Sequence, residues 1–155
     1  MIGLFLLGRE IFKNIWIGIV SAVAYVLHPM ALVYDRMALY ESLLGAFTVW
    51  SLYIIIILIR RIRLDVALIL GMVVGGGILT KSSGFFSIYL LPLSLLLFNF
   101  KQKDKWKQLG IWAWYYVLAI IIAYGFYSIL RLSPFFHIIE EKNELFVYSF
   151  KEWQM

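Results

Sequence analysis

Four charged side chains are the residues of this chain best suited to chemistry: Asp35, Arg36, Glu41 and Lys81. A carboxylate can accept a proton from a hydroxyl group, and a cation can stabilise phosphate oxygens, so two acids beside two cations suit a phosphate-bearing substrate. A charge near hydrocarbon is costly unless it reaches water or a partner, which makes these side chains functional candidates. A structural alternative stays open, in which Arg36 and Lys81 extend to lipid head groups and pair with the acids.

His28 is a further titratable residue close to these four, and it immediately precedes Pro29. Proline disfavours helical geometry at the residue before it, so we predict a helix break here. We interpret His28 as a polar residue at this break rather than as a metal ligand. The chain contains no cysteine, which excludes disulfides and cysteine-based metal sites.

The elements that must position these residues are membrane helices. Of the 155 residues, 63% are hydrophobic and 15% are charged, which is too apolar for a single soluble core. A membrane-spanning helix needs about 20 mostly apolar residues, and five runs approach this length. The sequence therefore predicts an all-α, polytopic transmembrane helix bundle with spans near residues 15–34, 42–59, 64–80, 84–100 and 109–130.

The two ends of the chain differ from these spans. Residues 1–7 form a short apolar stub followed by charges, which we interpret as the end of a span that begins upstream. Residues 1–130 are then a partial transmembrane domain. Residues 131–155 open with a Ser-Pro helix start and carry apolar residues at near-helical spacing, which predicts an extracytoplasmic interfacial helix. These features indicate an internal fragment of a larger protein.

The distribution of positive charge predicts the orientation. Nine of the fourteen lysines and arginines lie in alternate short loops, near residues 9–13, 60–63 and 101–107. The positive-inside rule places such loops in the cytoplasm, and their spacing gives no support to a nucleic-acid partner. We therefore expect a multi-pass protein of the plasma membrane, with the four candidate residues on the extracytoplasmic side.

Four glycines lie close together in the predicted third span: Gly71, Gly75, Gly76 and Gly77. Small residues let membrane helices approach one another closely. We interpret these glycines mainly as a packing face, and a role in a site stays open beside it.

Two segments of the chain resemble a known family. Residues 29–44 read PMALVYDRMALYESLL and resemble the P…R-x-A-L-x-[DE] segment of GT-C type membrane glycosyltransferases. Within that type they are similar to the protein mannosyltransferase and aminoarabinose transferase-like group, the relatives of glycosyltransferase family 39. Residues 75–81 read GGGILTK and resemble the G-L-x-x-L-T-K segment of the same group.

The resemblance implies an integral membrane enzyme of the cell envelope. Such an enzyme moves a sugar from a polyprenyl-phosphate donor to a lipid or protein acceptor on the extracytoplasmic side, among membrane lipids. Arg36 and Lys81 would hold the donor phosphate, and Glu41 matches the acidic position of the family, with Asp35 as an additional acid. Glu41 and Asp35 are thus the catalytic candidates. No residue is assigned to a metal, and a divalent cation is a candidate cofactor because some relatives use one.

The principal catalytic acid of the family lies in the first outer loop, and that loop is missing from this chain. We therefore expect the chain by itself to be inactive. Two other functions stay open, namely a transporter or flippase and a non-catalytic membrane assembly subunit. Transporters usually place polar groups near the midplane of broken helices, whereas the charges here lie at the ends of the predicted spans.

Overall fold

The structure of the chain is a computed structural model that describes residues 1–37, 39–100, 104–134 and 138. The described residues form helices and contain no strand, so the prediction of an all-α fold is confirmed. The α-helices are α1 (Ile2–Phe12), α2 (Ile15–Leu27), α3 (Pro29–Arg36), α4 (Tyr40–Arg60), α5 (Leu64–Thr80), α6 (Phe86–Leu90) and α7 (Lys105–Ser128). The 3₁₀-helices are η1 (Ser82–Phe85), η2 (Leu91–Leu97) and η3 (Ile129–Leu132).

The helices fall into two groups by their capacity to cross a membrane. Among the described residues, α4 and α7 are each long and apolar enough, and the bent pair of α2 and α3 raises the number to three. The apolar stretches Leu64–Thr80 and Ser82–Leu97 are shorter. Length and composition therefore support two or three spans, fewer than the five expected from the sequence.

The predicted break at His28 is confirmed. Helix α2 ends at Leu27, α3 begins at Pro29, and their axes differ by 65°. The backbone N–H of Ala31 donates a hydrogen bond to Nδ1 of His28 at 3.4 Å, so the imidazole caps the first turn of α3. Proline fits the first helical position because its missing N–H would have no partner there.

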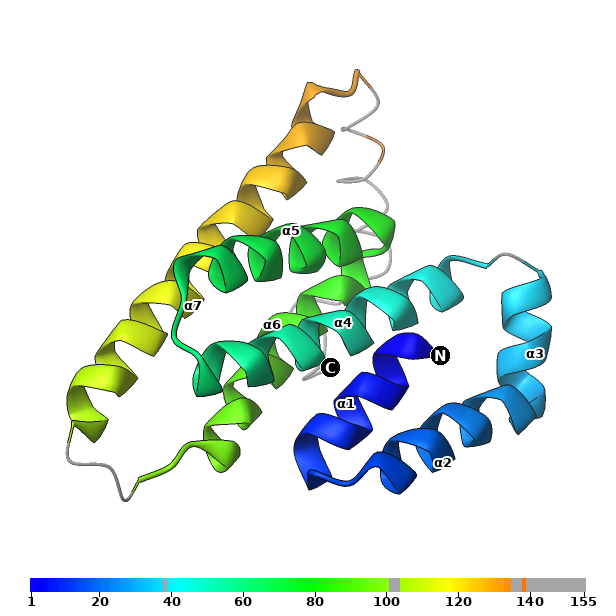
Figure 1. Cartoon of the computed structure of the whole chain (residues 1–155). Helices are drawn as coiled ribbons and strands as arrows, with labels where there is room; N and C mark the ends of the chain where they lie inside the picture. The colour runs from blue at the N-terminus through cyan, green and yellow to red at the C-terminus, as the bar shows by residue number, and fades with distance from the viewer. Residues whose placement is uncertain (38, 101–103, 135–137, 139–155) are drawn as a thin grey trace, which may run out of the picture.

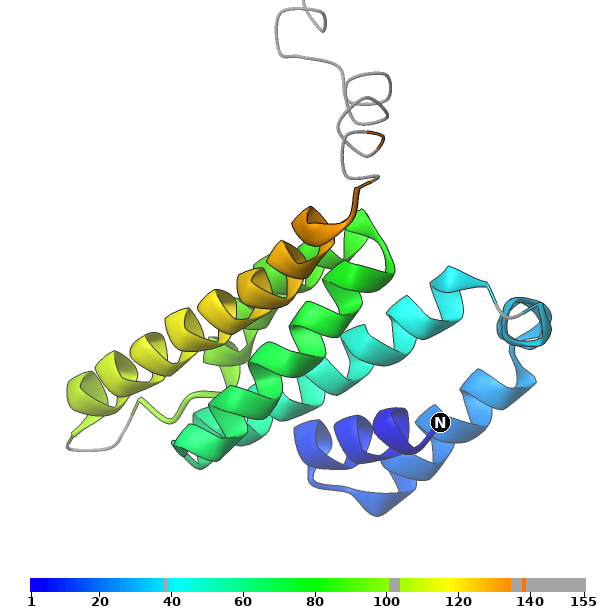
Figure 2. The ribbon, with the colours of Figure 1, turned by 90° about the horizontal axis from the view of Figure 1, so that it is seen from above.

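The five longer helices lie side by side in the order α7, α5, α4, α1 and α2 (Figures 1 and 2). The most deeply buried side chains come from the middle of this row, with Ile55 and Leu58 on α4, Leu70 on α5 and Ala123 on α7 fully covered. At the edge, α2 exposes apolar residues such as Trp16 and Val20. A helix that is apolar on its outward face is typical of a lipid-facing element.

The glycines of α5 allow two close helix contacts. A Cβ atom added at Gly71 or Gly75 would lie 2.7 Å from Cβ of Ile122 or 2.8 Å from Cβ of Phe126, both on α7. A Cβ atom at Gly76 would lie 2.6 Å from the ring of Phe47 on α4. These distances are shorter than any side chain tolerates, so the prediction that the glycine run is a packing face is confirmed.

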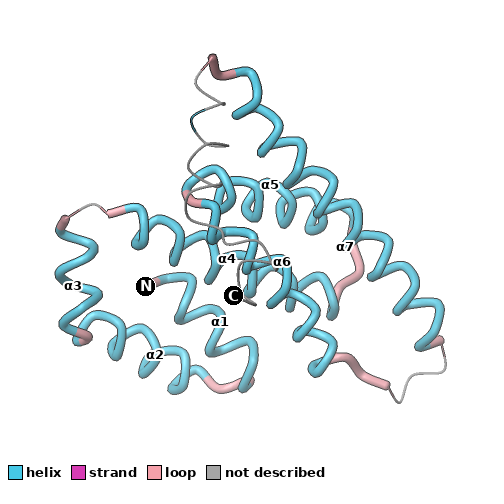
Figure 3. The backbone as a smooth tube through the Cα atoms, turned by 180° about the vertical axis from the view of Figure 1, so that it is seen from behind, coloured by secondary structure: helices cyan, strands magenta, loops and turns pink. Residues whose placement is uncertain are grey.

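The segment Ser82–Leu97 follows a broken path across α4 (Figure 3). It changes from 3₁₀ to α and back, and Pro92 lies at the start of η2. Proline has no N–H to donate to the carbonyl oxygen of Ile88, four residues earlier. The hydroxyl of Tyr116 on α7 donates to that oxygen at 2.7 Å instead. This hydrogen bond satisfies the carbonyl oxygen of Ile88, which would be costly to leave unpaired in an apolar environment.

Several expectations concern residues outside the described part of the chain. They include the interfacial helix expected within residues 131–155, of which the structure describes 131–134 and 138, and the basic loop at 101–107, of which it describes 104–107.

Candidate functional site

A cavity of about 360 Å³ lies at the end of the bundle where α3 leads into α4. It is bounded by the start of α1, by α3 together with Tyr25 of α2, and by the first half of α4. The side chains around it are mostly apolar or small, with two carboxylates among them. Its lining residues are Met1, Gly3, Leu4, Tyr25, Ala31, Tyr34, Asp35, Glu41, Ser42, Gly45, Ala46, Val49 and Trp50.

Asp35 reaches this cavity from α3 and is held by a tyrosine of α2. The hydroxyl of Tyr25 lies 3.1 Å and 3.2 Å from the two carboxylate oxygens and donates to them. The contact depends on the bend at His28, because a straight continuation of α2 would carry Asp35 away from Tyr25. Sequence reasoning missed Tyr25. The signal available was the predicted break, which turns the helix that follows it back toward α2.

Glu41 lies in the first turn of α4 and lines the same cavity. Its Oε1 accepts a hydrogen bond from Nζ of Lys81 at 2.7 Å, across a sequence separation of 40 residues. An acidic residue in the first turn also interacts favourably with the helix dipole. The side chains of Glu41 and Lys81 remain 44% and 46% exposed, so a ligand can reach both.

Lys81 is delivered by the end of α5. The helix stops at Thr80, and Lys81 adopts an extended backbone that leads into η1. A Cβ atom added at Gly84 would lie 2.5 Å from the carbonyl oxygen of Gly77, so only glycine lets η1 fold back so closely over α5. This tight turn follows Lys81 directly and helps fix the place where its side chain leaves α5.

Arg36 behaves differently from the other three candidates. It is the last residue of α3, it is exposed, and it does not line the cavity. Adjacent residues on a helix point about 100° apart, which explains why Asp35 faces the cavity and Arg36 does not. Among the described residues Arg36 forms no ion pair. The structure thus places Asp35 and Glu41 in one cavity, pairs Lys81 with Glu41, and leaves Arg36 outside the cavity.

Ser42 is a further polar residue at this cavity that sequence reasoning missed. Its hydroxyl oxygen is buried and has no hydrogen-bond partner in the described part of the chain. A buried hydroxyl without a partner is costly, and a turn of the side chain toward the cavity would let a ligand hydroxyl satisfy it. Ser42 therefore adds a neutral hydrogen-bonding group beside the two acids.

The carboxylates do not by themselves form a metal site. No cluster of three or more histidine, cysteine, aspartate or glutamate side chains occurs within the described ranges. Glu41 is already paired with a cation, and Asp35 accepts from a hydroxyl group. Mg²⁺ usually keeps several waters and is bound by one or two carboxylates together with substrate phosphates, so the two acids would need such further ligands to hold it.

The arrangement suits a ligand that carries both hydroxyl groups and a negative charge. Asp35 has no cationic partner in the described residues and can accept a proton, while Lys81 can turn from Glu41 toward a phosphate oxygen. The charged groups remain exposed, so a ligand can replace the water around them.

Comparison with known protein families gives a match over most of the chain. Residues 1–128 match the family model described as dolichyl-phosphate-mannose-protein mannosyltransferase. Neither a curated protein nor a solved structure matches the chain.

Proposed function

The chain belongs to the dolichyl-phosphate-mannose-protein mannosyltransferase family, a family of membrane glycosyltransferases, and from this premise we propose that it forms part of an enzyme that transfers a sugar from a polyprenyl-phosphate donor. The observation that carries the proposal is the shared cavity of Asp35 and Glu41, with Lys81 bound to Glu41 at 2.7 Å. The acceptor is a hydroxyl group of a protein or a lipid, and the family description supports the protein.

The proposed roles follow from charge. The bond that breaks joins the sugar to the donor phosphate, and the leaving polyprenyl phosphate gains negative charge. Lys81 stabilises that charge, and Arg36, which lies outside the cavity at the end of α3, would have to turn toward the donor phosphate to contribute. The bond that forms joins the sugar to the acceptor oxygen, whose proton passes to a carboxylate. We assign this proton to Asp35, because Glu41 is occupied in orienting Lys81.

We also propose the membrane topology expected from the sequence. Five spans within residues 1–130 would place the loops near residues 9–13 and 60–63 in the cytoplasm and the Asp35–Glu41 cavity on the outer side of the plasma membrane. Residues 131–155 would follow as an extracytoplasmic interfacial segment. The bent pair of α2 and α3 supports the first span, with α3 lying at the outer membrane edge.

The function is tested by sugar transfer in membranes that contain the protein encoded by the complete gene. A labelled polyprenyl-phosphate sugar is the donor, and the readout is label bound covalently to acceptor. Asp35→Asn should lower the turnover about 100-fold or more, because it removes the proton acceptor without changing side-chain size. Glu41→Gln should lower it as well, since Lys81 loses its partner.

Asp65→Asn is the matched control. Asp65 is paired with Arg63 at 2.6 Å and lies in the first turn of α5, which begins at the opposite end of the bundle from the cavity (Figure 1). Its loss removes the same charge away from the cavity, and transfer should not change. Undiminished transfer by both Asp35→Asn and Glu41→Gln would contradict the assigned site. Movement of the donor across the membrane without covalent product would favour a flippase, and a partner that stays bound in mild detergent, with no transfer, would favour an assembly subunit.

A further inference from the structure

A second cavity of about 360 Å³ lies at the opposite ends of the same two helices, α1 and α4. Most of its lining is charged, and the charge is strongly unbalanced, with four cations facing one carboxylate. The lining residues are Arg9, Glu10, Lys13, Tyr53, Ile57, Arg60 and Arg61. The distance from Glu41 to Arg60 along α4 is about 28 Å, so this cavity is separate from the proposed catalytic one.

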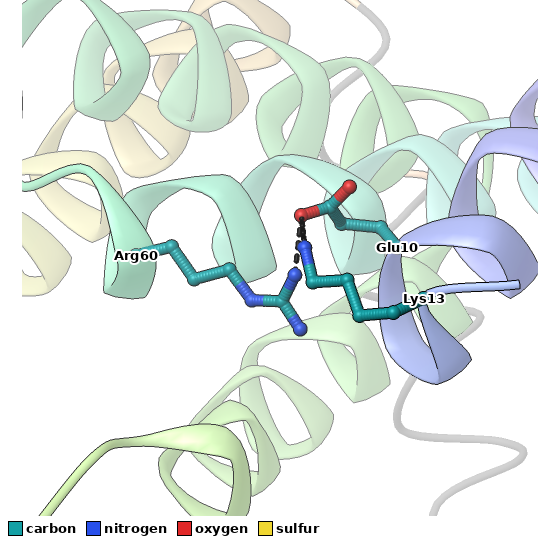
Figure 4. Close-up of polar contacts among 3 residues, drawn as sticks. All are labelled: Glu10, Lys13 and Arg60. Carbon is teal, nitrogen blue, oxygen red and sulfur yellow. Dashed lines mark hydrogen bonds and ion pairs between the residues drawn. The ribbon is translucent and has the colours of Figure 1, made fainter.

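The single acid of this cavity organises two of the cations (Figure 4). Oε1 of Glu10 accepts from Nζ of Lys13 at 2.6 Å and from Nη1 of Arg60. Because Glu10 is on α1 and Arg60 is at the end of α4, this contact fastens the two helices together. The carboxylate oxygen is therefore shared between two cations and cannot neutralise both.

Within the part of the chain that the structure describes, the other two cations have no acidic partner. Arg9 lies over the ring of Phe5, with its guanidinium carbon 5.9 Å from the ring centroid, and Arg61 follows the last residue of α4. Within the described ranges neither forms an ion pair. Cations gathered in a concave site beside apolar helices raise the local potential and attract an anion.

The backbone at Lys13 gives independent support. Lys13 has a φ angle of 55° and is the one non-glycine residue with positive φ in the described part of the chain. This left-handed conformation closes α1 and is far easier for glycine or asparagine than for lysine. This turn fixes where the Lys13 side chain leaves the end of α1, at the cationic cavity that it lines.

The apolar surroundings indicate the source of the anion. Phe12, Ile15 and Trp16, which flank Lys13 in the turn between α1 and α2, are 62%, 54% and 70% exposed. Tryptophan beside basic residues at helix ends is typical of the membrane interface, where head groups meet acyl chains. A soluble anion would gain nothing from these side chains, whereas a phospholipid would contact them with its acyl chains.

We propose that the cavity lined by Arg9, Lys13, Arg60 and Arg61 binds the phosphate of an anionic phospholipid. The inference is independent of the proposed glycosyl transfer, since it concerns the other end of the molecule. Basic pockets between membrane helices are a recognised mode of binding anionic head groups. The bound lipid would hold this end of α1 and α4 at the membrane surface.

The test uses the purified full-length protein in zwitterionic detergent, titrated with phosphatidylglycerol, with phosphatidylcholine or with inorganic phosphate. The readout is the lipid concentration at half of the maximal shift in melting temperature. Phosphatidylglycerol should stabilise the protein at the lowest concentration. Each cation near an anionic head group contributes about a factor of five to the affinity. Lys13→Asn, which keeps a residue suited to the left-handed turn, should therefore weaken binding about five-fold. The double variant Arg9→Gln/Arg61→Gln should weaken it about 25-fold.

Arg63→Gln is the matched control, because Arg63 lies at the same end of the bundle, is paired with Asp65 and does not line the cavity. The Arg63→Gln variant should bind phosphatidylglycerol with the affinity of the unaltered protein. Equal weakening by Arg63→Gln and by the cavity variants would overturn the proposal in favour of general surface attraction. Equal stabilisation by phosphatidylcholine, or saturation by inorganic phosphate alone, would overturn it as well.

Discussion

The two ends of α1 and α4 carry cavities of the same volume and opposite character. At one end, two carboxylates lie in an apolar setting, and one cation, Lys81 at the end of α5, pairs with Glu41. At the other end, four cations surround one carboxylate. The lining of the two cavities agrees with the different roles that we propose for them, proton acceptance at one end and anion binding at the other.

The ion pairs at the two ends also differ in exposure. The side chains of Glu10 and Arg60 are 20% and 24% exposed, whereas those of Glu41 and Lys81 are 44% and 46% exposed. An exposed pair contributes little to stability because water competes for both partners. The first pair therefore fastens helices together, while the second can exchange its partner for a ligand.

The largest effect expected from this difference is on Lys81→Gln. If Lys81 stabilises the leaving phosphate, transfer should fall about 100-fold, as for the loss of one donor to a developing charge. The melting temperature should hardly change, since the pair with Glu41 is exposed. Transfer rates and melting curves of the same preparation measure the two effects.

Arg63→Gln is the control for Lys81→Gln, because it breaks another exposed pair, 61% and 55% exposed, at the opposite end of the bundle. It should leave both transfer and melting temperature unchanged. A fall in transfer that matched that of Lys81→Gln would mean that the two ends are not distinct, and the comparison would fail.

A second way to distinguish the roles of the two cavities uses the packing of α5, because Lys81 directly follows this helix. Gly75→Val would drive a side chain into Phe126 of α7, whose Cβ lies 2.8 Å from the position that a Cβ atom of residue 75 would take. Overpacking of this kind costs about 1–3 kcal/mol of unfolding free energy. Displacement of α5 should also lower transfer, while phosphatidylglycerol binding should persist, because α5 does not line the basic cavity.

Gly125→Val provides the comparison for Gly75→Val. Gly125 is on α7, and nothing lies within 4 Å of a Cβ atom added there. The protein should therefore keep its stability and its transfer activity. If the Gly75→Val variant were as stable as the Gly125→Val variant, the close contact between α5 and α7 at Gly75 would be contradicted.

The sequence was sufficient for features that depend on local chemistry. Pro29 predicted the helix break, because proline acts on the residue before it wherever it occurs. The glycines of α5 predicted close helix packing, because a residue without a Cβ atom lets helices approach one another closely. The proximity of Glu41 and Lys81 followed from alternating spans, since both lie at helix ends on one side.

Features that depend on the angle between elements were out of reach. The bond from Tyr25 to Asp35 requires the 65° bend, and a pattern can place a break without giving its angle. The segment 84–100 was expected to be one span, yet Pro92 divides it, and the compensating bond comes from Tyr116, 28 residues beyond its acceptor. The shared use of Glu10 by Lys13 and Arg60 likewise joins residues whose relation is set only when α1 packs on α4.

The smallest effect tests whether Glu10 and Arg60 act as a fastening. Glu10→Gln should lower the free energy of unfolding by about 2 kcal/mol, since a partly buried hydrogen bond between charged groups is lost. Arg60→Gln should cost a similar amount, and the double variant should cost clearly less than the two together, because each single substitution already removes the contact between Glu10 and Arg60. Chemical unfolding in detergent, followed by tryptophan fluorescence, measures the four free energies of the cycle.

A double-mutant cycle of unfolding free energies with Glu41→Gln and Lys81→Gln tests the difference between the two ion pairs. Because that pair is nearly half exposed, its coupling energy should lie well below that of Glu10 and Arg60. Coupling of equal size would mean that Lys81 is as firmly held as Arg60. Lys81 would then have to break a strong contact before it could meet a phosphate, and the proposed exchange of partners at the acidic end would be untenable.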